Sequence, residues 1–282
     1  MNTSVSLTVI FTTFNEEHNI GIALDTVRGW ASEIIVVDSF STDNTESIVR
    51  HYPEITFLQR QYIGPAFQKN WAIPLAKNEW VLLMDADERI SIEMKHEIAE
   101  ILRGGMTDVR CTMDDETTSE TSNIKHRTSD IPYDCYWLGF THYFMGKKVQ
   151  YSGWQNDKTI RLIKRDKCRY NNNKVHEEIL TEGLQVGQLK NKFAHYTFKD
   201  MNHFIAKQQR YAIWSAQDKD NTTGKITYFH LFFKPLFRFF KHFILKKGFL
   251  DGYVGFVISA VAAWSVFMRY VYMLENRRNS KV

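Results

Sequence analysis

Four short apolar runs, each closed by polar or acidic residues, alternate with stretches of helical spacing through the first hundred residues. The runs are Val5–Thr13, Glu33–Asp38, Ile55–Leu58 and Trp80–Met84. Because they are apolar at consecutive positions, they predict strands that are buried on both faces. Strands that alternate with helices are typical of a mostly parallel sheet covered on both sides. The sequence therefore predicts an α/β fold with a Rossmann-like central sheet and flanking helices.

The helices expected between these strands have recognisable ends. Ser41-Thr42-Asp43 is a good N-cap cluster, Pro74 weakens the second half of one helix, and Gly104-Gly105 ends another. Further along, we expect a strand at Lys158–Ile163. The expected helices lie at Ile20–Trp30, around Ile48-Val49, and at Phe67–Ala76, Ile92–Leu102 and Met201–Trp214.

Acidic residues follow two of the predicted strands, and ligands bind at such strand ends in open α/β sheets. Asp85 and Asp87 come directly after Trp80–Met84. Side chains two apart in an extended chain point the same way, and two carboxylates on one side suit Mg²⁺ or Mn²⁺ bound to a diphosphate. The alternative is a polar turn with Asp as a cap, because D-x-D is common by chance. Asp38 is placed to accept hydrogen bonds from a ribose or a base, and a loop acid that caps the next helix is the alternative.

The net charge of +4 is unevenly distributed over the 282 residues. Residues 224–282 hold ten Lys/Arg and two Asp/Glu, a balance of +8, which leaves −4 for residues 1–223. We expect a main domain at 1–223 and a basic, aromatic, helical tail at 224–282. Three scattered cysteines (Cys111, Cys135 and Cys168) and an N-terminus without signal-peptide features predict an intracellular, reduced protein.

Three motifs stand in the order and spacing of family 2 glycosyltransferases with the GT-A fold, which the chain therefore resembles. They are Thr13-Phe14-Asn15-Glu16, the stretch from Asp38 to Asp43, and Asp85-Ala86-Asp87. Within that family the chain is similar to the lipopolysaccharide core β-1,4-glucosyltransferase group. Residues 110–130 depart from the group as an apparent insertion. The residues that carry this closer resemblance are Asp85–Glu88, Gly153-Trp154, Asp157, Arg161-Leu162, Val175–Glu177 and Gly248–Gly252.

The resemblance implies a metal-dependent, inverting transfer of a hexose, with glucose from UDP-glucose favoured, onto a lipid-linked saccharide. Lipopolysaccharide core or another surface glycan is the expected acceptor, and Mn²⁺ or Mg²⁺ the expected cofactor. Asp85 and Asp87 would contact the metal. The residues implied to contact the nucleotide sugar are Thr13, Phe14, Asn15, Glu16, Asp38, Lys69, Asn70, Asp85 and Arg161.

Three assignments remain open at this stage. Glu177 is preferred over Asp157 as the general base, because the family's base commonly stands about where Glu177 does. Arg161 either holds the diphosphate or forms an ion pair with Asp157 or Asp166, and the two roles are about equally favoured. His195 either completes the metal shell or is a core histidine, and the core role is favoured.

The tail predicts contact with an anionic membrane surface. Lys225–Lys247 has six Lys/Arg, no acid and eight Phe/Tyr. In a helix, Leu236, Phe239, Phe240 and Phe243 share one face, while Arg238, Lys241 and His242 lie opposite. An ordinary packed helix is the alternative. Gly252–Met268 is uncharged, and we expect it to be interfacial or packed rather than spanning. Nucleic acid could also bind such a tail, but it is not expected as a partner, because the aromatic residues lie on a different helix face from Arg and Lys and no nucleic-acid motif is present.

These features together predict a peripheral enzyme on the cytoplasmic face of the inner membrane. Two other functions compete with this interpretation. One is sugar transfer to polyprenyl phosphate, which would give a sugar phosphodiester rather than a glycosidic bond. The other is a nucleotide-binding module without turnover, which the set of Asp85, Asp87 and Glu177 argues against.

Overall fold

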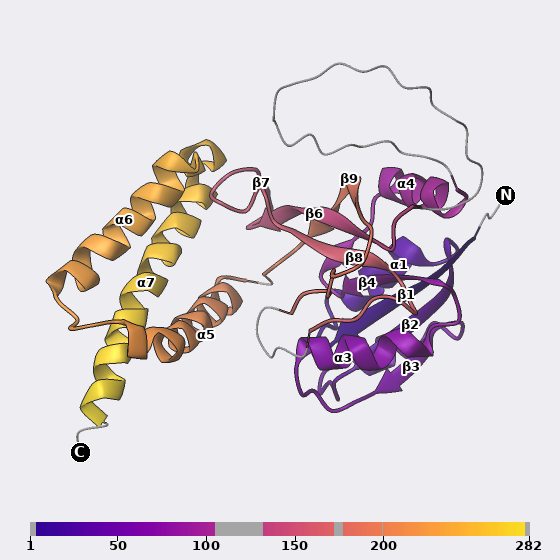
Figure 1. Cartoon of the computed structure of the whole chain (residues 1–282), viewed down its shortest axis with the longest axis horizontal. Coiled ribbons are helices and arrows are strands. Elements are labelled where there is room, and N and C mark those ends of the chain that lie inside the picture. The colour runs from indigo at the N-terminus through magenta and orange to yellow at the C-terminus, as the bar shows by residue number, and fades with distance from the viewer. Residues whose placement is uncertain (1–3, 105–131, 172–176, 199, 280–282) are drawn as a thin grey trace. The chain divides into compact units, whose positions relative to one another are not determined.

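The computed structural model describes residues 4–104, 132–171, 177–198 and 200–279. The predicted insertion at 110–130, Cys111 and His176 lie outside these residues. Contacts divide the chain into two compact units (Figure 1), which are described separately. The first comprises Met1–Gly139 and Lys158–Phe193, and the second Phe140–Asp157 and Ala194–Val282. The predicted boundary between a main domain and a tail near residue 223 stays a prediction.

A mostly parallel sheet forms the centre of the first unit. Strands β1 to β4 pair in parallel in the order β3-β2-β1-β4, and β8 and β6 then continue the sheet in antiparallel pairing. The order ends with β9 and β5. The strand bounds are β1 (Val5–Thr13), β2 (Ala31–Asp38), β3 (Thr56–Gln59), β4 (Trp80–Asp85), β5 (Glu88–Arg89), β6 (Cys135–Phe144), β8 (Lys158–Lys164) and β9 (Val186–His195). The predicted α/β class is confirmed.

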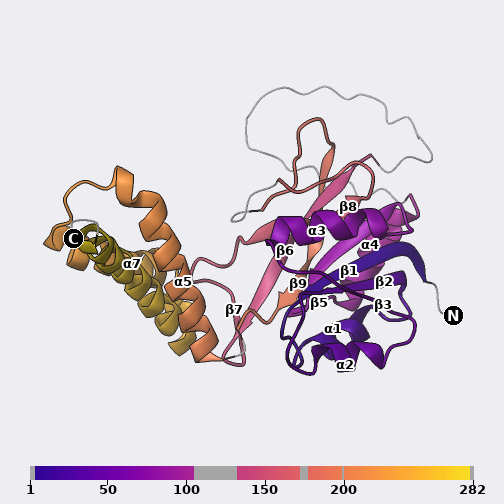
Figure 2. The ribbon, with the colours of Figure 1, turned by 90° about the horizontal axis from the view of Figure 1, so that it is seen from below.

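Helices cover this sheet, and Figure 2 shows α1 and α2 on one side of the strands and α3 on the other. The α-helical hydrogen bonding of α3 ends where Pro74 lacks an N–H, and the chain continues as a short 3₁₀ turn, η1. Ile10, Val81 and Leu83 of the central strands are buried in one core with Ile73 and Ile163. The bounds are α1 (Ile20–Val27), α2 (Thr45–Arg50), α3 (Pro65–Ala72), η1 (Ile73–Leu75) and α4 (Ile92–Leu102).

The second unit is largely helical, and its long helix α7 packs against both α5 and α6. Phe204 of α5 and Ile258 of α7 share a core with Phe144 and Val149. Both cysteines that the structure describes, Cys135 and Cys168, are buried and unpaired, and they belong to the first unit. The bounds are β7 (Lys147–Val149), α5 (Met201–Lys219), η2 (Asp220–Thr222), η3 (Phe229–Phe233), α6 (Lys234–Phe240), η4 (Lys241–Leu245), η5 (Gly248–Asp251) and α7 (Tyr253–Asn279).

The faces of the α6 region differ from those expected from the sequence. His242, expected on the polar face, is buried and its Nδ1 lies 2.9 Å from the carbonyl oxygen of Ser152. Leu236 and Phe240 are exposed, whereas Phe239 and Phe243 are half-buried and meet the ring of Phe256 on α7. The reason is that η3 and η4 are π-helical turns on either side of α6, which rotate the face presented to α7.

Candidate active site

The carboxyl ends of β1, β2 and β4 meet in register. Thr12 of β1 lies opposite Asp85 of β4, and Thr13 lies opposite Asp38 of β2. Parallel pairing brings these strand ends to one edge of the sheet, and the loops that follow them carry most of the predicted site residues. The expectation that polar groups gather at this edge is therefore met for Asp38 and Asp85.

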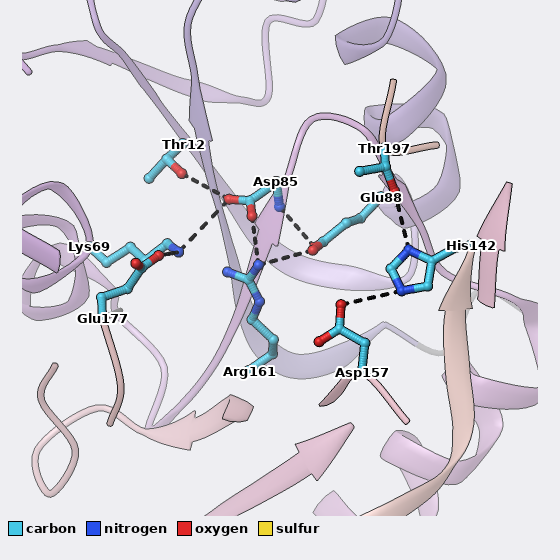
Figure 3. A network of polar contacts seen from close by, with 9 residues as sticks. All are labelled: Thr12, Lys69, Asp85, Glu88, His142, Asp157, Arg161, Glu177 and Thr197. Atoms are coloured by element: carbon cyan, nitrogen blue, oxygen red, sulfur yellow. Dashed lines mark hydrogen bonds and ion pairs between the residues drawn. The ribbon is translucent and has the colours of Figure 1, made fainter. Parts of the chain in front are cut away.

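Asp85 is the centre of a polar network at this edge (Figure 3). Its Oδ2 lies 2.6 Å from Nη2 of Arg161, and its Oδ1 accepts a hydrogen bond of 3.2 Å from the Thr12 hydroxyl. Lys69 Nζ lies 4.0 Å from the same Oδ1. Arg161 reaches Asp85 because β8, which carries it, is the antiparallel neighbour of β4. One carboxylate is thus shared by two cations from different elements.

Glu88 is the buried counter-charge of Arg161, whose ion pairs, in the ranges that the structure describes, are with Asp85 and Glu88 and not with the expected Asp157 or Asp166. Asp166 pairs with Arg165 instead, and Asp157 lies against His142. Glu88 is fully buried, its Oε1 lies 3.0 Å from Arg161 Nη2, and its Oε2 accepts the backbone N–H of Asp85 at 2.9 Å. Burial opposes the charge of Arg161, but Asp85 and Glu88 raise its pKa well above the ordinary value. The Nε and Nη1 atoms of Arg161 are buried without a hydrogen-bond partner among the residues described. Arg161 is therefore a permanently charged group with donor capacity left over.

Lys69 links Asp85 to Glu177, a residue far away in sequence. Its Nζ lies 3.3 Å from Glu177 Oε1 and 5.3 Å from the centre of the Tyr170 ring. Asn70 holds Tyr170 in place through two hydrogen bonds. Its Nδ2 donates to the backbone carbonyl of Tyr170 at 2.9 Å, and its Oδ1 accepts from the backbone N–H of Tyr170 at 2.8 Å. Burial would lower the pKa of Lys69, yet Asp85 and Glu177 raise it above its usual value. Lys69 thus stays an ammonium between two carboxylates.

The loops after β1 and β2 are joined to each other by hydrogen bonds. Asp38 is fully buried and its carboxylate accepts the backbone N–H of Ser41 at 2.8 Å. The N–H of Asn15 donates to the Ser41 hydroxyl, and the N–H of Glu16 donates to Thr45 Oγ1, both at 2.8 Å. Asp38, Asn15 and Glu16 therefore shape these loops, and their direct contact with a nucleotide stays a prediction.

Two neighbouring residues of the β1 loop are better placed to receive a ligand. The side chain of Phe14 is 54% exposed, which is unusual for a large aromatic residue directly after a buried strand. The hydroxyl of Thr13 is buried and has no hydrogen-bond partner within the described part of the chain. The exposed ring of Phe14 is a surface on which a planar base can stack, and the Thr13 hydroxyl keeps unused hydrogen-bonding capacity beneath the surface.

Asp157 and His195 belong to the second unit. Asp157 Oδ2 lies 3.3 Å from Nε2 of the buried His142, whose Nδ1 lies 3.2 Å from the Thr197 hydroxyl. His195 ends β9, with its ring 5.1 Å from those of Phe140 and His142. These aromatic surroundings fit the favoured core role of His195. The roles of Asp157 as a base and of His195 as a metal ligand stay predictions.

The carboxylates at the end of β4 fit a divalent metal bound with a diphosphate. Asp85 and Asp87 are half-buried, whereas Glu88 is enclosed and committed to Arg161. Within the described ranges, no group of three or more Cys, His, Asp or Glu side chains is close enough to form a complete cage. Mg²⁺ in phosphate-transfer sites is commonly held by one or two carboxylates, with waters and substrate phosphates as the other ligands. The donor set therefore suits a metal that arrives with its nucleotide.

Sequence reasoning missed Thr12 and Tyr170, and it named Glu88 only as the last residue of the Asp85–Glu88 motif, without assigning it a role. Thr12 and Tyr170 are placed by strand register and by the Asn70 contact, which no local pattern encodes. Glu88 directly follows the D-x-D motif, and an acid at that position next to a short strand was the available sign.

Comparison with known proteins places the chain in a defined group. Residues 8–179 match the family described as "Glycosyl transferase family 2". An "Uncharacterized glycosyltransferase" of Rickettsia felis is 26% identical over 95% of this chain and 89% of its own length. The "Lipopolysaccharide core biosynthesis glycosyltransferase LpsC" of Rhizobium meliloti is 25% identical over 91% and 90%. The crystal structure of S. aureus TarS 1-349 with UDP-GlcNAc is 14% identical over 97% and 92%, with a TM-score of 0.44.

Proposed function

Because the chain belongs to glycosyltransferase family 2, we propose that it is an inverting, metal-dependent hexosyltransferase acting on a lipid-linked saccharide. Glucose from UDP-glucose is the proposed donor. Lipopolysaccharide core or a related surface glycan is the proposed acceptor, which the name of the Rhizobium meliloti relative supports. Such an acceptor is carried by a membrane lipid, so we assign the enzyme to the cytoplasmic face of the inner membrane as a peripheral protein.

One observation carries this proposal: Lys69 joins Asp85, the proposed metal ligand, to the distant acid Glu177. An inverting transfer needs positive charge for the departing nucleotide diphosphate and a carboxylate for the proton of the attacking hydroxyl. Asp85 and Asp87 would hold the metal ion that supplies this positive charge. Lys69 and Arg161 are fixed cations next to Asp85. Glu177 is assigned the second role over Asp157, because its contact with Lys69 brings it to the side chain that also contacts Asp85.

The proposed chemistry assigns a separate step to each group. Asp85 and Asp87 would hold Mn²⁺ or Mg²⁺, and the ion would supply positive charge to the leaving diphosphate. Glu177 takes the proton of the acceptor hydroxyl while that oxygen bonds to C1 of the sugar. The C1–O bond to the diphosphate breaks on the opposite face, and UDP leaves. Phe14 stacks on the base, and Thr13 lines the base pocket behind it.

A transfer assay with labelled UDP-glucose, Mn²⁺ and a lipid-linked core acceptor tests the proposal. The full chain should form a glycosidic product with an inverted anomeric centre, assigned by NMR. Glu177→Gln should lower kcat by about 10²–10⁴-fold. The adjacent, exposed Glu178→Gln is the matched control and should transfer at the wild-type rate. Wild-type kcat in Glu177→Gln would contradict the assignment of the base.

The same assay separates the competing functions. A sugar phosphodiester formed on added polyprenyl phosphate, with no glycosidic product, would overturn the proposed acceptor. If no nucleotide sugar is transferred or hydrolysed in the presence of Mn²⁺, the hexosyltransferase proposal itself fails.

A further inference from the structure

An exposed aromatic stripe runs along one side of the segment η3–α6–η4. Its members recur at intervals of three or four residues, as core residues do, but all are 43–65% exposed. The stripe, named here the phenylalanine stripe, consists of Phe229, Phe232, Phe233, Leu236, Phe237, Phe240 and Ile244. A soluble monomer rarely exposes a continuous apolar patch of this kind, so the stripe indicates a binding surface.

The apolar surface continues past the end of η4. Leu245, Phe249, Leu250, Tyr253 and Phe256 are 48–59% exposed at the turn that leads into α7. Lys147 of β7 lies 4.3 Å from the centre of the Tyr253 ring, which brings the exposed β6–β7 turn next to this end of the surface. The exposed apolar side chains therefore extend from η3 to the first turn of α7, and a shallow apolar hollow beside them is lined by Phe232, Leu236 and Phe267.

Charges around these apolar side chains favour an anionic lipid surface as their occupant. Arg238 and Lys241 are exposed within the segment, Lys247 is exposed just after it, and Lys147 is exposed beside Tyr253. No acid occurs between residues 225 and 250. Asp251, the next acid, is held inward by the N–H groups of Gln150 and Tyr151 and by the Ser152 hydroxyl. Aromatic and basic side chains in one band are typical of segments that lie at the headgroup level.

Helix α7 is long and apolar enough to cross a membrane, but its partners argue against a span. It is linked to polar groups of α5 and η2 at three levels. The Ser265 hydroxyl donates to the Gln208 carbonyl at 3.2 Å, Gln209 Nε2 donates to the Tyr272 hydroxyl at 2.8 Å, and Arg277 pairs with Asp220 at 2.7 Å. A spanning α7 would draw Arg210, Gln209 and other polar groups of α5 into hydrocarbon, which is strongly unfavourable.

From these contacts we propose that the phenylalanine stripe and the turn before α7 form a monotopic docking surface for anionic lipid. The segment η3–α6–η4 lies in the plane of the headgroups, and α7 supports it from behind without crossing the bilayer. This inference rests on the proposed function only for the identity of the acceptor, because it places the enzyme where a lipid-linked saccharide is presented. Lipid binding itself requires neither donor nor acceptor.

Vesicle flotation of the full chain tests the proposal without sugar nucleotide. The wild type should float with vesicles of phosphatidylglycerol and phosphatidylethanolamine, float much less with phosphatidylcholine alone, and be released by alkaline carbonate. The triple variant Phe233→Ser/Phe237→Ser/Phe240→Ser should lose flotation at least about tenfold while keeping its melting temperature, because these side chains are exposed. The control Tyr211→Ser/Trp214→Ser removes exposed aromatics from α5 and should float like the wild type.

Each of the other possible results contradicts a specific part of the proposals. Equal flotation of the triple variant and the wild type would overturn the docking surface, and resistance to carbonate extraction would favour a span of α7. A stable wild-type dimer in light scattering that the triple variant loses would identify a second copy of the chain as the occupant. A protein that floats but transfers no sugar would refute the proposed function and leave the docking surface standing.

Discussion

At the scale of single residues, the candidate site depends on how the buried charge of Arg161 is balanced. Asp85 is half-exposed and is the partner that a metal would share, whereas Glu88 is fully enclosed. Glu88 therefore acts as the fixed counter-charge, and it also orients the backbone of Asp85 through the N–H of that residue. Its contribution is structural as well as electrostatic.

Replacing Glu88 by Ala should destabilise the protein by about 3 kcal/mol, because the buried guanidinium of Arg161 then keeps only Asp85 as a partner. Urea unfolding followed by circular dichroism measures this. Glu100→Ala, on the exposed side of α4, is the control and should change the free energy of unfolding by less than about 0.5 kcal/mol. Equal stability of the two variants would show that Arg161 does not need Glu88.

His242 should make stability depend on pH. Burial, together with Arg238 and Lys246, lowers the pKa of His242 to about 4. In the unfolded chain the pKa returns to about 6.5, so between these values only the unfolded chain binds the proton. Stability should therefore fall as the pH drops from about 6.5 towards about 4.

Asn is the informative substitution, since its amide can donate to the Ser152 carbonyl but does not titrate. His242→Asn should lose less melting temperature than the wild type between neutral pH and about pH 5. His96→Asn on the exposed surface of α4 should keep the wild-type dependence. A loss in His242→Asn as large as in the wild type would assign the acid sensitivity to other groups.

At the scale of elements, Gly255 sets the closest approach of α7 to η5. A Cβ atom on Gly255 would clash with the carbonyl group of Gly248, whereas one on Gly224 would meet no atom within 4 Å. Gly255→Ala should destabilise the protein by about 1–3 kcal/mol through overpacking, and Gly224→Ala should not. Thermal unfolding of the two variants compares them directly. Equal melting temperatures would mean that α7 can shift away from η5 without loss.

The elements that the sequence predicts well are those whose burial is encoded locally. Residues 5–13 form β1 and residues 92–102 form α4 within the predicted bounds, because strands buried on both faces and capped amphipathic helices carry strong local patterns. The prediction of which residues share each face of α6 was wrong in part. The π-helical turns η3 and η4 change the register that a regular helix would keep.

The candidate site could be predicted from the sequence only in part. Asp85 and Asp87 carry a motif at a strand end, so their position follows from local order. The contact between Lys69 and Glu177 depends on folding across 108 residues, and no pattern near either residue encodes it. The enclosure of Glu88 likewise arises from β8 lying beside β4, which only the assembled sheet provides.

At the scale of the whole molecule, the basic tail and the acidic body should contribute separately to turnover. If the phenylalanine stripe brings the enzyme to its acceptor, the triple variant should show a KM at least about tenfold higher for acceptor in anionic vesicles. Its kcat for a short, detergent-soluble acceptor should be unchanged. A parallel loss of kcat on the soluble acceptor would show that the substitutions damage the catalytic unit instead.

The central claim is that Asp85 and Asp87 hold a divalent metal together with a UDP-sugar. Isothermal titration of UDP-glucose into the full chain, with and without Mn²⁺, tests it most directly. We predict binding that Mn²⁺ strengthens at least about tenfold in the wild type, and no strengthening in Asp87→Asn. Equal affinity with and without Mn²⁺ in the wild type, or an unchanged Mn²⁺ effect in Asp87→Asn, would contradict the account.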